Sequence, residues 1–548
     1  MEARPSSLLA IATAVALLAG CAHSTGTSPV ARAAAPETGA AVEKDATAAD
    51  PLRIAEADIA DVAGRMQRGE LSSEQLTQAY LDRIAAIDDA GPRLNAVIEI
   101  NPDAIAEARR LDAERRAGTV RGPLHGVPVL VKDNIDATPM VNSAGSMALA
   151  AHRPSKDAPI VEALRAAGAV VLGKTNLSEW ANFRSTRSTS GWSGRGGQTR
   201  NPYVLDRSPC GSSSGTGAAI AASLATVGVG TETDGSILCP SAVNGLVGLK
   251  PTVGLVGRSG IIPISASQDT AGPMTRSVAD AAALLEVLAS AKDAQDRATT
   301  EVPASPRDYT AALRTDALRG ARIGVVRKHG VNAQPDVDAS FERALSHLRE
   351  AGAVLVDVEI PTAGKWNAPE FTVLKYEFKD GLERYLRESG APVKSLAELV
   401  EFNRANAGTE MPYFGQELLE QTQSLGALDS AEYRKASEAA RRLAGREGID
   451  AALAKDKLDA LVAPTTGPAW PIDLVNGDNF TGAGYGAAAV SGYPSLTVPM
   501  GNARGLPLGI TFMGSRWSEA RLLGLGYAFE QRARERRAPT FVPTLPLP

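Results

Sequence analysis

A segment rich in serine and glycine, residues 208–252, holds the side chains best suited to chemistry. It begins SPCGSSSGTG, continues with small apolar residues, and then reads GTETDGS. A free serine is a weak nucleophile, so a catalytic serine needs a partner that removes its proton. The first question is therefore which serine in this segment reacts and which group is its base.

Three kinds of site fit such a segment. A phosphate-binding loop at a helix start would need GxxxxGK[ST], or GxGxxG followed by a helix, and neither is present. A nucleophile elbow, G-x-S-x-G, is matched by residues 211–215 with Ser213 at its centre. An elbow needs a later histidine, and only His329 and His347 follow, both in charged stretches. The third kind uses two serines and an earlier lysine, with no histidine.

Lys132 is the candidate base for that third arrangement. It follows the apolar run VPVLV at residues 127–131, which predicts a buried strand and an inward-pointing lysine. Burial penalises an ammonium group and lowers its pKa by several units when complete. A neutral lysine can accept a proton, whereas a strand-end lysine that reaches solvent cannot serve in this way.

Several motifs in this order resemble the amidase signature family of serine hydrolases. The family pattern runs GGSSGGS, about twenty residues, GTDTGGSI and then GLKPT. The serines at positions 212 and 236 are 24 residues apart (236 − 212), as that pattern requires. The resemblance extends over residues 52–545. Its matching strings are residues 131–136, 173–176, 211–213, 230–237, 248–252, 272–276 and 492–499.

The resemblance implies a Ser-Ser-Lys relay. Ser236 would attack the carbonyl carbon, and Ser212, after a cis peptide bond, would pass the proton to Lys132. The oxyanion hole would consist of the backbone N–H groups of Thr233, Asp234, Gly235 and Ser236. No cofactor and no metal are implied, and the five histidines and few cysteines show no zinc-ligand spacing.

One departure from the family pattern concerns the leaving group. Most members have Gly-Gly-Ser at the nucleophile, whereas this chain has Asp234-Gly235-Ser236. That variant is similar to bacterial peptide amidases, which release ammonia from the C-terminal amide of peptides. We therefore expect hydrolysis of peptide amides or small acyl amides through an acyl-enzyme. The alternatives are a broad aryl or aliphatic amidase-esterase and a non-catalytic binding protein. Asp234 would either accept hydrogen bonds from the leaving –NH₂ or cap the turn.

Alternating strand and helix signals predict an α/β fold. The resemblance implies the amidase signature fold, a central mixed β-sheet covered by helices on both faces. Residues 335–455 are expected to be mostly helical, and the turn before the nucleophile is expected at residues 231–236. The predicted strands are 127–131, 169–173, 227–230, 322–326 and 461–464, and the predicted helices are 72–84, 103–117, 159–167, 217–224, 278–290, 342–352 and 431–444.

The first 51 residues predict export. Residues 8–20 are an apolar run too short to span a bilayer but suited to a signal peptide, and residues 18–21, LAGC, resemble a lipobox. Residues 1–21 are therefore expected to be a lipoprotein signal peptide ending in a lipidated Cys21. Residues 22–51 would be a flexible tether and residues 52–545 a single amidase domain. The exported protein would be either a membrane-anchored lipoprotein facing the periplasm or a periplasmic protein. There Cys210 and Cys239 could form a disulfide.

Composition narrows the range of partners. The chain has 548 residues, a net charge of −5 and a pI of about 5.8. It lacks the basic excess that nucleic-acid binding or a polybasic membrane surface would need. We expect a small amide or peptide-amide substrate, no nucleic acid, membrane contact only through the lipid anchor, and no obligate protein partner.

Overall fold

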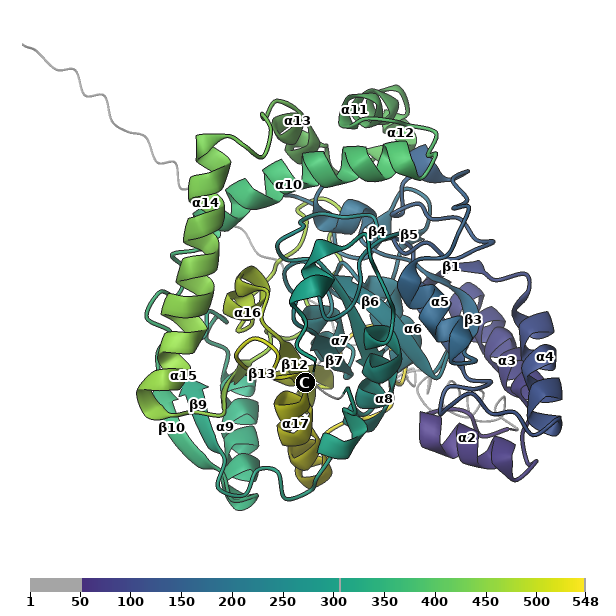
Figure 1. Cartoon of the computed structure of the whole chain (residues 1–548), viewed down its shortest axis with the longest axis horizontal. Coiled ribbons are helices and arrows are strands. Elements are labelled where there is room, and N and C mark those ends of the chain that lie inside the picture. Colours follow the sequence, from purple (N-terminus) through teal and green to yellow (C-terminus); the bar gives the residue numbers. More distant parts are fainter. Residues whose placement is uncertain (1–51, 305–306, 547–548) are drawn as a thin grey trace, which may run out of the picture.

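The computed structural model describes residues 52–304 and 307–546, which are built around an 11-stranded sheet (Figure 1). The strand order is β1-β3-β2-β6-β8-β7-β12-β13-β11-β9-β10. Parallel and antiparallel neighbours both occur, so the predicted mixed sheet is confirmed. The strands are β1 Val97–Ile100, β2 Pro128–Lys132, β3 Val170–Thr175, β6 Val227–Glu232, β7 Val247–Lys250, β8 Thr270–Thr275, β9 Arg322–Val326, β10 Val354–Val358, β11 Ala460–Pro464, β12 Ser495–Ala503 and β13 Leu506–Met513. A separate two-stranded sheet pairs β4 Trp192–Ser193 with β5 Gly197–Gln198.

Strand β2 lies parallel between β3 and β6, and every residue of β2 is buried. Its sequence, PVLVK, is a nearly continuous apolar run, as expected for a strand with both faces covered. The lysine is the last residue of the strand, opposite Thr175 of β3. The sheet therefore carries Lys132 into the protein interior.

Helices cover both faces of the sheet, as predicted. Helices α5, α8, α17 and α9 contact one another in that order and pack on the sheet, while α6 and α7 form a second group. The helices are α2 Ile59–Gln67, α3 Ser73–Arg83, α4 Ala104–Arg116, α5 Pro159–Ala166, α6 Ser214–Ala221, α7 Leu238–Val243, α8 Val278–Ala289, α9 Pro335–Glu350, α10 Asn367–Glu388, α11 Leu396–Ala405, α12 Ala407–Glu410, α13 Glu417–Gln423, α14 Ala431–Arg441, α15 Ala451–Asp456, α16 Gly486–Ser491 and α17 Glu519–Ala533.

Helices α10 to α14 form a layer along one side of the molecule, at the top and upper left of Figure 1. Helix α10 packs on the rest of the protein through Phe378, whose ring lies 5.0 Å from that of Phe183. Gly381 allows the helix to approach Pro263 closely, because a Cβ there would lie 3.0 Å from the proline ring. This layer thus brings residues 367–388 against loops near the centre of the sheet.

The central segment differs from prediction at three boundaries. The predicted helix 217–224 was wrong by three residues: α6 begins at Ser214, because the Ser213 carbonyl already accepts the Gly217 N–H. The predicted strand 227–230 continues as β6 to Glu232, so the turn expected at residues 231–236 is confined to residues 233–236. Thr231 and Glu232 keep pairing with β8, which holds them in the sheet.

Two later helices also extend beyond the predicted ranges. Helix α9 starts at Pro335, where the Gln334 side chain accepts the Val337 N–H, rather than at residue 342. Helix α14 continues past Arg441 as a π-helix, Arg442–Asp450. By contrast α3 begins as predicted, with Ser72 and Gln75 forming a capping box.

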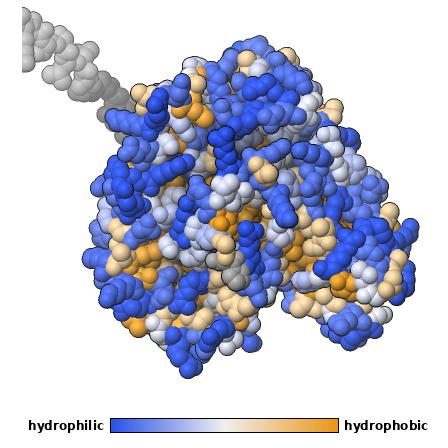
Figure 2. Space-filling view, in the orientation of Figure 1, coloured by the Kyte–Doolittle hydropathy of each residue, from blue (hydrophilic) through white to orange (hydrophobic). Residues whose placement is uncertain are grey.

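The face seen in Figure 2 is largely hydrophilic, with hydrophobic residues in scattered groups. Among the described residues, no helix combines the length and apolar character needed to cross a membrane. The predicted signal peptide, Cys21 lipidation and tether lie outside the described residues.

Candidate active site

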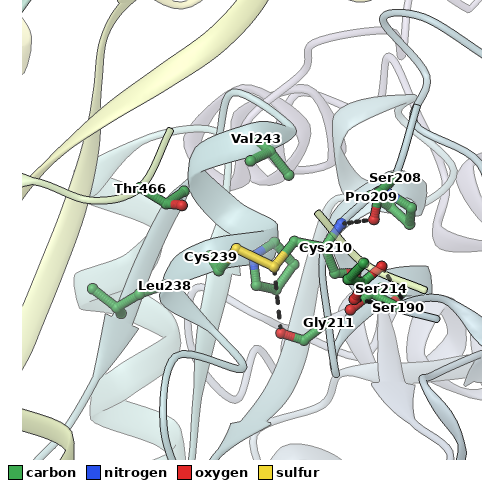
Figure 3. The surroundings of a disulfide bond; sticks show 12 residues. Ser190, Ser208, Pro209, Cys210, Gly211, Ser214, Leu238, Cys239, Val243 and Thr466 are labelled. Atoms are coloured by element: carbon green, nitrogen blue, oxygen red, sulfur yellow. Dashed lines mark hydrogen bonds between the residues drawn. A yellow bond between two sulfur atoms is a disulfide. The ribbon is translucent and has the colours of Figure 1, made fainter. Parts of the chain in front are cut away.

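Two chain segments that carry the predicted serines lie side by side. The N–H of Ser213 donates to the carbonyl of Ser236, with 3.2 Å between nitrogen and oxygen. A disulfide joins Cys210 to Cys239, whose Cα atoms are 6.0 Å apart (Figure 3). The link spans 29 residues and connects the segment before Ser212 to the start of α7, just after Ser236. The disulfide that the sequence left open is thus formed.

Lys132 reaches the first of these segments. Its Nζ lies 2.8 Å from Ser212 Oγ, 2.9 Å from Thr231 Oγ1 and 3.3 Å from the Thr231 carbonyl oxygen. The lysine has no exposed surface. Burial lowers the pKa of Lys132 to about 7, against the opposing effect of the Asp269 and Glu232 carboxylates. The predicted base is therefore brought to the predicted relay serine in a form that is partly neutral at neutral pH.

The backbone before Ser212 is tightly packed. The Gly211–Ser212 peptide bond is cis, as the resemblance implied. A Cβ on Gly211 would lie 2.2 Å from Ser178 Oγ and 2.7 Å from Asn182 Oδ1, so only glycine fits. Asn182 belongs to a run of three left-handed residues, 180–182, that places its side chain against this glycine.

Ser213, the centre of the G-x-S-x-G match, is fully buried. Its hydroxyl donates to the Thr231 carbonyl at 3.0 Å and accepts the Thr231 N–H at 3.2 Å. These contacts use the hydroxyl to connect α6 to β6. The elbow arrangement is therefore not formed at this serine.

The turn of residues 233–236 is organised by the residue before it. Glu232 Oε2 accepts the N–H groups of Ile237 and Leu238, at 2.7 and 2.9 Å. Gly235 has a φ of +80°, and a Cβ there would lie 2.1 Å from the Tyr485 hydroxyl. Within the described part of the chain, the N–H groups of Thr233, Asp234 and Ser236 donate no hydrogen bond. Unpaired backbone donors beside a candidate nucleophile are what an oxyanion hole requires.

Asp234 stands out by its exposure. From residue 212 to residue 257 it is the one exposed residue, and all others are buried. Its carboxyl group hydrogen bonds to that of Glu370 at the start of α10. Burial by surrounding protein and the nearby carboxylates raise the pKa of Asp234 well above its usual range.

A cleft of about 900 Å³ opens beside this turn. Asn134, Thr231 and Thr233 line it near the turn, together with residues 261–264. Helix α10 contributes Gly381, Arg384, Tyr385 and Glu388 to its lining. This volume is in the range of sites that enclose organic ligands.

Sequence reasoning missed three residues of the site. Thr231 contacts Lys132, and Asn134 Nδ2 donates to Thr231 Oγ1 at 3.0 Å. Both lie inside matched motifs, so a signal was present. Glu370 lies in a helical region with no motif. A separate observation concerns metals: the described residues contain no group of three or more His, Cys, Asp or Glu that could hold an ion.

Comparison with known proteins identifies the family. Residues 75–523 match the Amidase family. The native peptide amidase of Stenotrophomonas maltophilia is 59% identical to this chain, with a TM-score of 0.87 covering 90% of this chain and 100% of that chain. The peptide amidase PAM in complex with the competitive inhibitor chymostatin is 60% identical, with a TM-score of 0.87 over 88% and 99% of the two chains. A probable amidase of Arabidopsis thaliana is 39% identical over 505 residues, 89% of this chain and 92% of that protein.

The chain therefore belongs to the amidase family, with the amidase signature fold. It is an enzyme that hydrolyses amides. Its similarity to peptide amidases agrees with the resemblance found in the sequence around residues 234–236.

Proposed function

We propose that this amidase hydrolyses the C-terminal amide of peptides, or of small acyl amides, and releases ammonia. The observation that carries the proposal is the contact of the buried Lys132 with Ser212, beside a turn with unpaired backbone donors and a cleft large enough for a peptide. The similarity to peptide amidases over 88 to 90% of the chain supports the substrate class.

The proposed reaction uses one proton path. Neutral Lys132 accepts the Ser212 hydroxyl proton while Ser212 accepts that of Ser236, and Ser236 Oγ bonds to the amide carbon. The free N–H groups of Thr233, Asp234 and Ser236 stabilise the oxyanion, each contributing about 3 kcal/mol to the barrier reduction. The Gly235 N–H, also predicted for this role, instead donates to the Glu232 carboxylate. The proton then returns along the same path to the nitrogen, the C–N bond breaks and ammonia leaves. Water repeats the sequence on the acyl-enzyme and releases the acid.

The substrate class is tested with one peptide in three forms: C-terminal amide, C-terminal acid, and extended so that the same bond is internal. We expect ammonia from the amide form alone. Cleavage within the extended peptide would instead define a protease. A wider panel of anilides and methyl esters separates the proposal from a broad amidase-esterase.

The choice of nucleophile is tested by replacing Ser236 and Ser213 in separate variants. Ser236→Ala should abolish turnover with an unchanged melting temperature, because alanine fits any backbone conformation of serine. Ser213→Ala is the matched control, since Ser213 is buried in structural hydrogen bonds. An active Ser236→Ala enzyme beside an inactive Ser213→Ala enzyme would favour the elbow. A wild-type protein that turns over none of these substrates would favour the non-catalytic alternative.

The proposed location is the periplasm, with the chain anchored by lipid on Cys21. The LAGC sequence at residues 18–21 supports it, as does the Cys210–Cys239 disulfide, since such bonds persist in oxidising compartments. Cys21→Ser should move the enzyme from the membrane fraction to the soluble fraction, or leave an uncut precursor. Retention of a processed Cys21→Ser protein in the membrane would contradict lipidation.

A further inference from the structure

The Asp234 carboxylate is available for a ligand because another residue caps the turn. Capping is the usual structural role of an acidic residue in such a position. Here Glu232 accepts the N–H groups that follow the nucleophile. Asp234 accepts no backbone hydrogen bond from the described residues, and its side chain is exposed two residues before Ser236. The turn therefore does not need this carboxylate.

Glu370 of helix α10 holds the Asp234 side chain. It lies in the first turn of α10, is 8% exposed, and its Oε1 accepts from Gln268 Nε2 at 2.9 Å. The same Gln268 nitrogen donates to the Thr233 carbonyl at 3.3 Å. Glu370 is thus fixed to the turn by one oxygen and hydrogen bonded to Asp234 through its carboxyl group.

Two carboxyl groups can hydrogen bond to each other only if they share a proton. Burial raises the pKa of Glu370, and burial with neighbouring carboxylates raises that of Asp234, so the pair retains a proton at neutral pH. The other titratable groups that act on the pair are Glu232, Lys250 and Tyr485. The hydrogen bond between the two groups raises the pKa of Asp234 and lowers that of Glu370, so the shared proton belongs on Asp234, whose second oxygen can still accept a hydrogen bond.

We propose that Asp234 determines leaving-group specificity by accepting a hydrogen bond from the –NH₂ of the scissile amide, and that Glu370 is the positioning residue that holds it. The inference rests on the proposed function. A primary amide offers two N–H donors, whereas an ester offers none at its leaving oxygen. A substrate with a free carboxylate would be repelled by the negative charge of the Asp234–Glu370 pair, so peptide acids bind poorly and the acid product leaves.

The test compares kcat/KM for a peptide amide with that for the methyl ester of the same peptide. Asp234→Ala should lower the amide-to-ester ratio by about tenfold, because the hydrogen bond to the leaving nitrogen is lost. Glu370→Ala should lower it similarly. Glu370→Gln should keep it within about threefold, since glutamine can accept from Gln268 and donate to the Asp234 carboxylate, which keeps that side chain in place. The amide-to-ester ratio of the Glu370→Gln enzyme should also stay constant at alkaline pH, where the wild-type ratio declines as the shared proton is lost.

Glu377→Gln is the matched control on the same helix. Glu377 is buried and anchors α10 through Ser265, Ser267 and Tyr433, away from Asp234. The Glu377→Gln variant should leave the amide-to-ester ratio unchanged even if α10 packs less tightly. An unchanged ratio in Asp234→Ala, an equal fall in Glu377→Gln, or a Glu370→Gln enzyme as impaired as Glu370→Ala would overturn the inference. If wild type releases no ammonia from peptide amides yet cleaves esters or anilides, the proposed function itself fails.

Discussion

Two buried lysines on neighbouring strands, Lys132 and Lys174, have very different surroundings. Lys174 Nζ donates to the carbonyls of Ile135 and Val141, at 2.7 and 3.1 Å, and lies 3.2 Å from the Asp133 carboxylate. Lys132 instead faces two hydroxyls and one weaker carbonyl contact. Carbonyl and carboxylate oxygens only accept from an amine, whereas a hydroxyl can also donate to one. The difference separates a structural lysine from one able to act as a base.

The sheet places the two side chains on opposite faces. Val131 is opposite Lys174 in the β2–β3 register, and Lys132 is opposite Thr175. Since alternate residues of a strand face opposite sides, Lys132 shares its side with Thr175, whose hydroxyl contacts Thr216 of α6. That is the side of the Ser212 segment. A shift of β2 by one residue would move the Lys132 side chain to the face that holds Lys174, away from the Ser212 segment.

The largest effect should come from removing the base. Lys132→Met should lower the rate of acylation by about 10² to 10⁴-fold, the usual contribution of general-base catalysis. The melting temperature should change little or rise, because a buried amine that forms no ion pair with the described residues is replaced by an apolar side chain. Single-turnover acylation with a fluorogenic amide and a thermal melt measure both. A near-normal rate would remove Lys132 from the mechanism.

Lys174→Met should show the opposite pattern. It removes the partner of the buried Asp133 and two carbonyl contacts, at a cost of about 3 kcal/mol in the free energy of unfolding. Arg195 still contacts Asp133, which favours the lower end of the usual range for broken buried pairs. Urea unfolding measures the loss. If the variant is as stable as wild type but inactive, the roles assigned to the two lysines are wrong.

A covalent link stabilises the segments next to Lys132 but not the surroundings of Lys174. The Cys210–Cys239 disulfide joins the segments that flank Ser212 and Ser236, whereas Lys174 is surrounded by ion pairs and carbonyls. Closing a loop of 29 residues stabilises a fold by about 2 to 4 kcal/mol. Reduction with dithiothreitol should lower the melting temperature of wild type, and the double variant Cys210→Ala, Cys239→Ala should start at that lower value. A double variant that melts like oxidised wild type would contradict this role.

Motif spacing predicted the chemistry of the site better than its full set of residues. The VKDNID string selected Lys132 over Lys174, although both follow apolar strand-like runs, and the spacing of 24 residues selected Ser212 and Ser236. The disulfide stayed open because it depends on a distance between Cα atoms. Glu370 was not found because it comes from α10, whose surface pattern carries no motif. Its role depends on a tertiary contact between residues 136 positions apart (370 − 234), which no local pattern reveals.

The smallest expected effect tests a property that the two lysines share. Burial lowers the pKa of both, to about 7 for Lys132, yet only Lys132 should enter the pH–rate profile. An ammonium cannot accept a proton, so kcat/KM should be half its plateau near pH 7 and fall about tenfold for each further unit towards acid. Lys174→Met, assayed below its melting temperature, should keep this limb at the same pH, whereas the residual activity of Lys132→Met should lack it. Circular dichroism at pH 5 separates titration from unfolding. A wild-type profile that stays flat to pH 5 in folded enzyme would mean that the lysine is already neutral there or is not the base, and a limb that disappears in Lys174→Met would assign the titration to the other lysine.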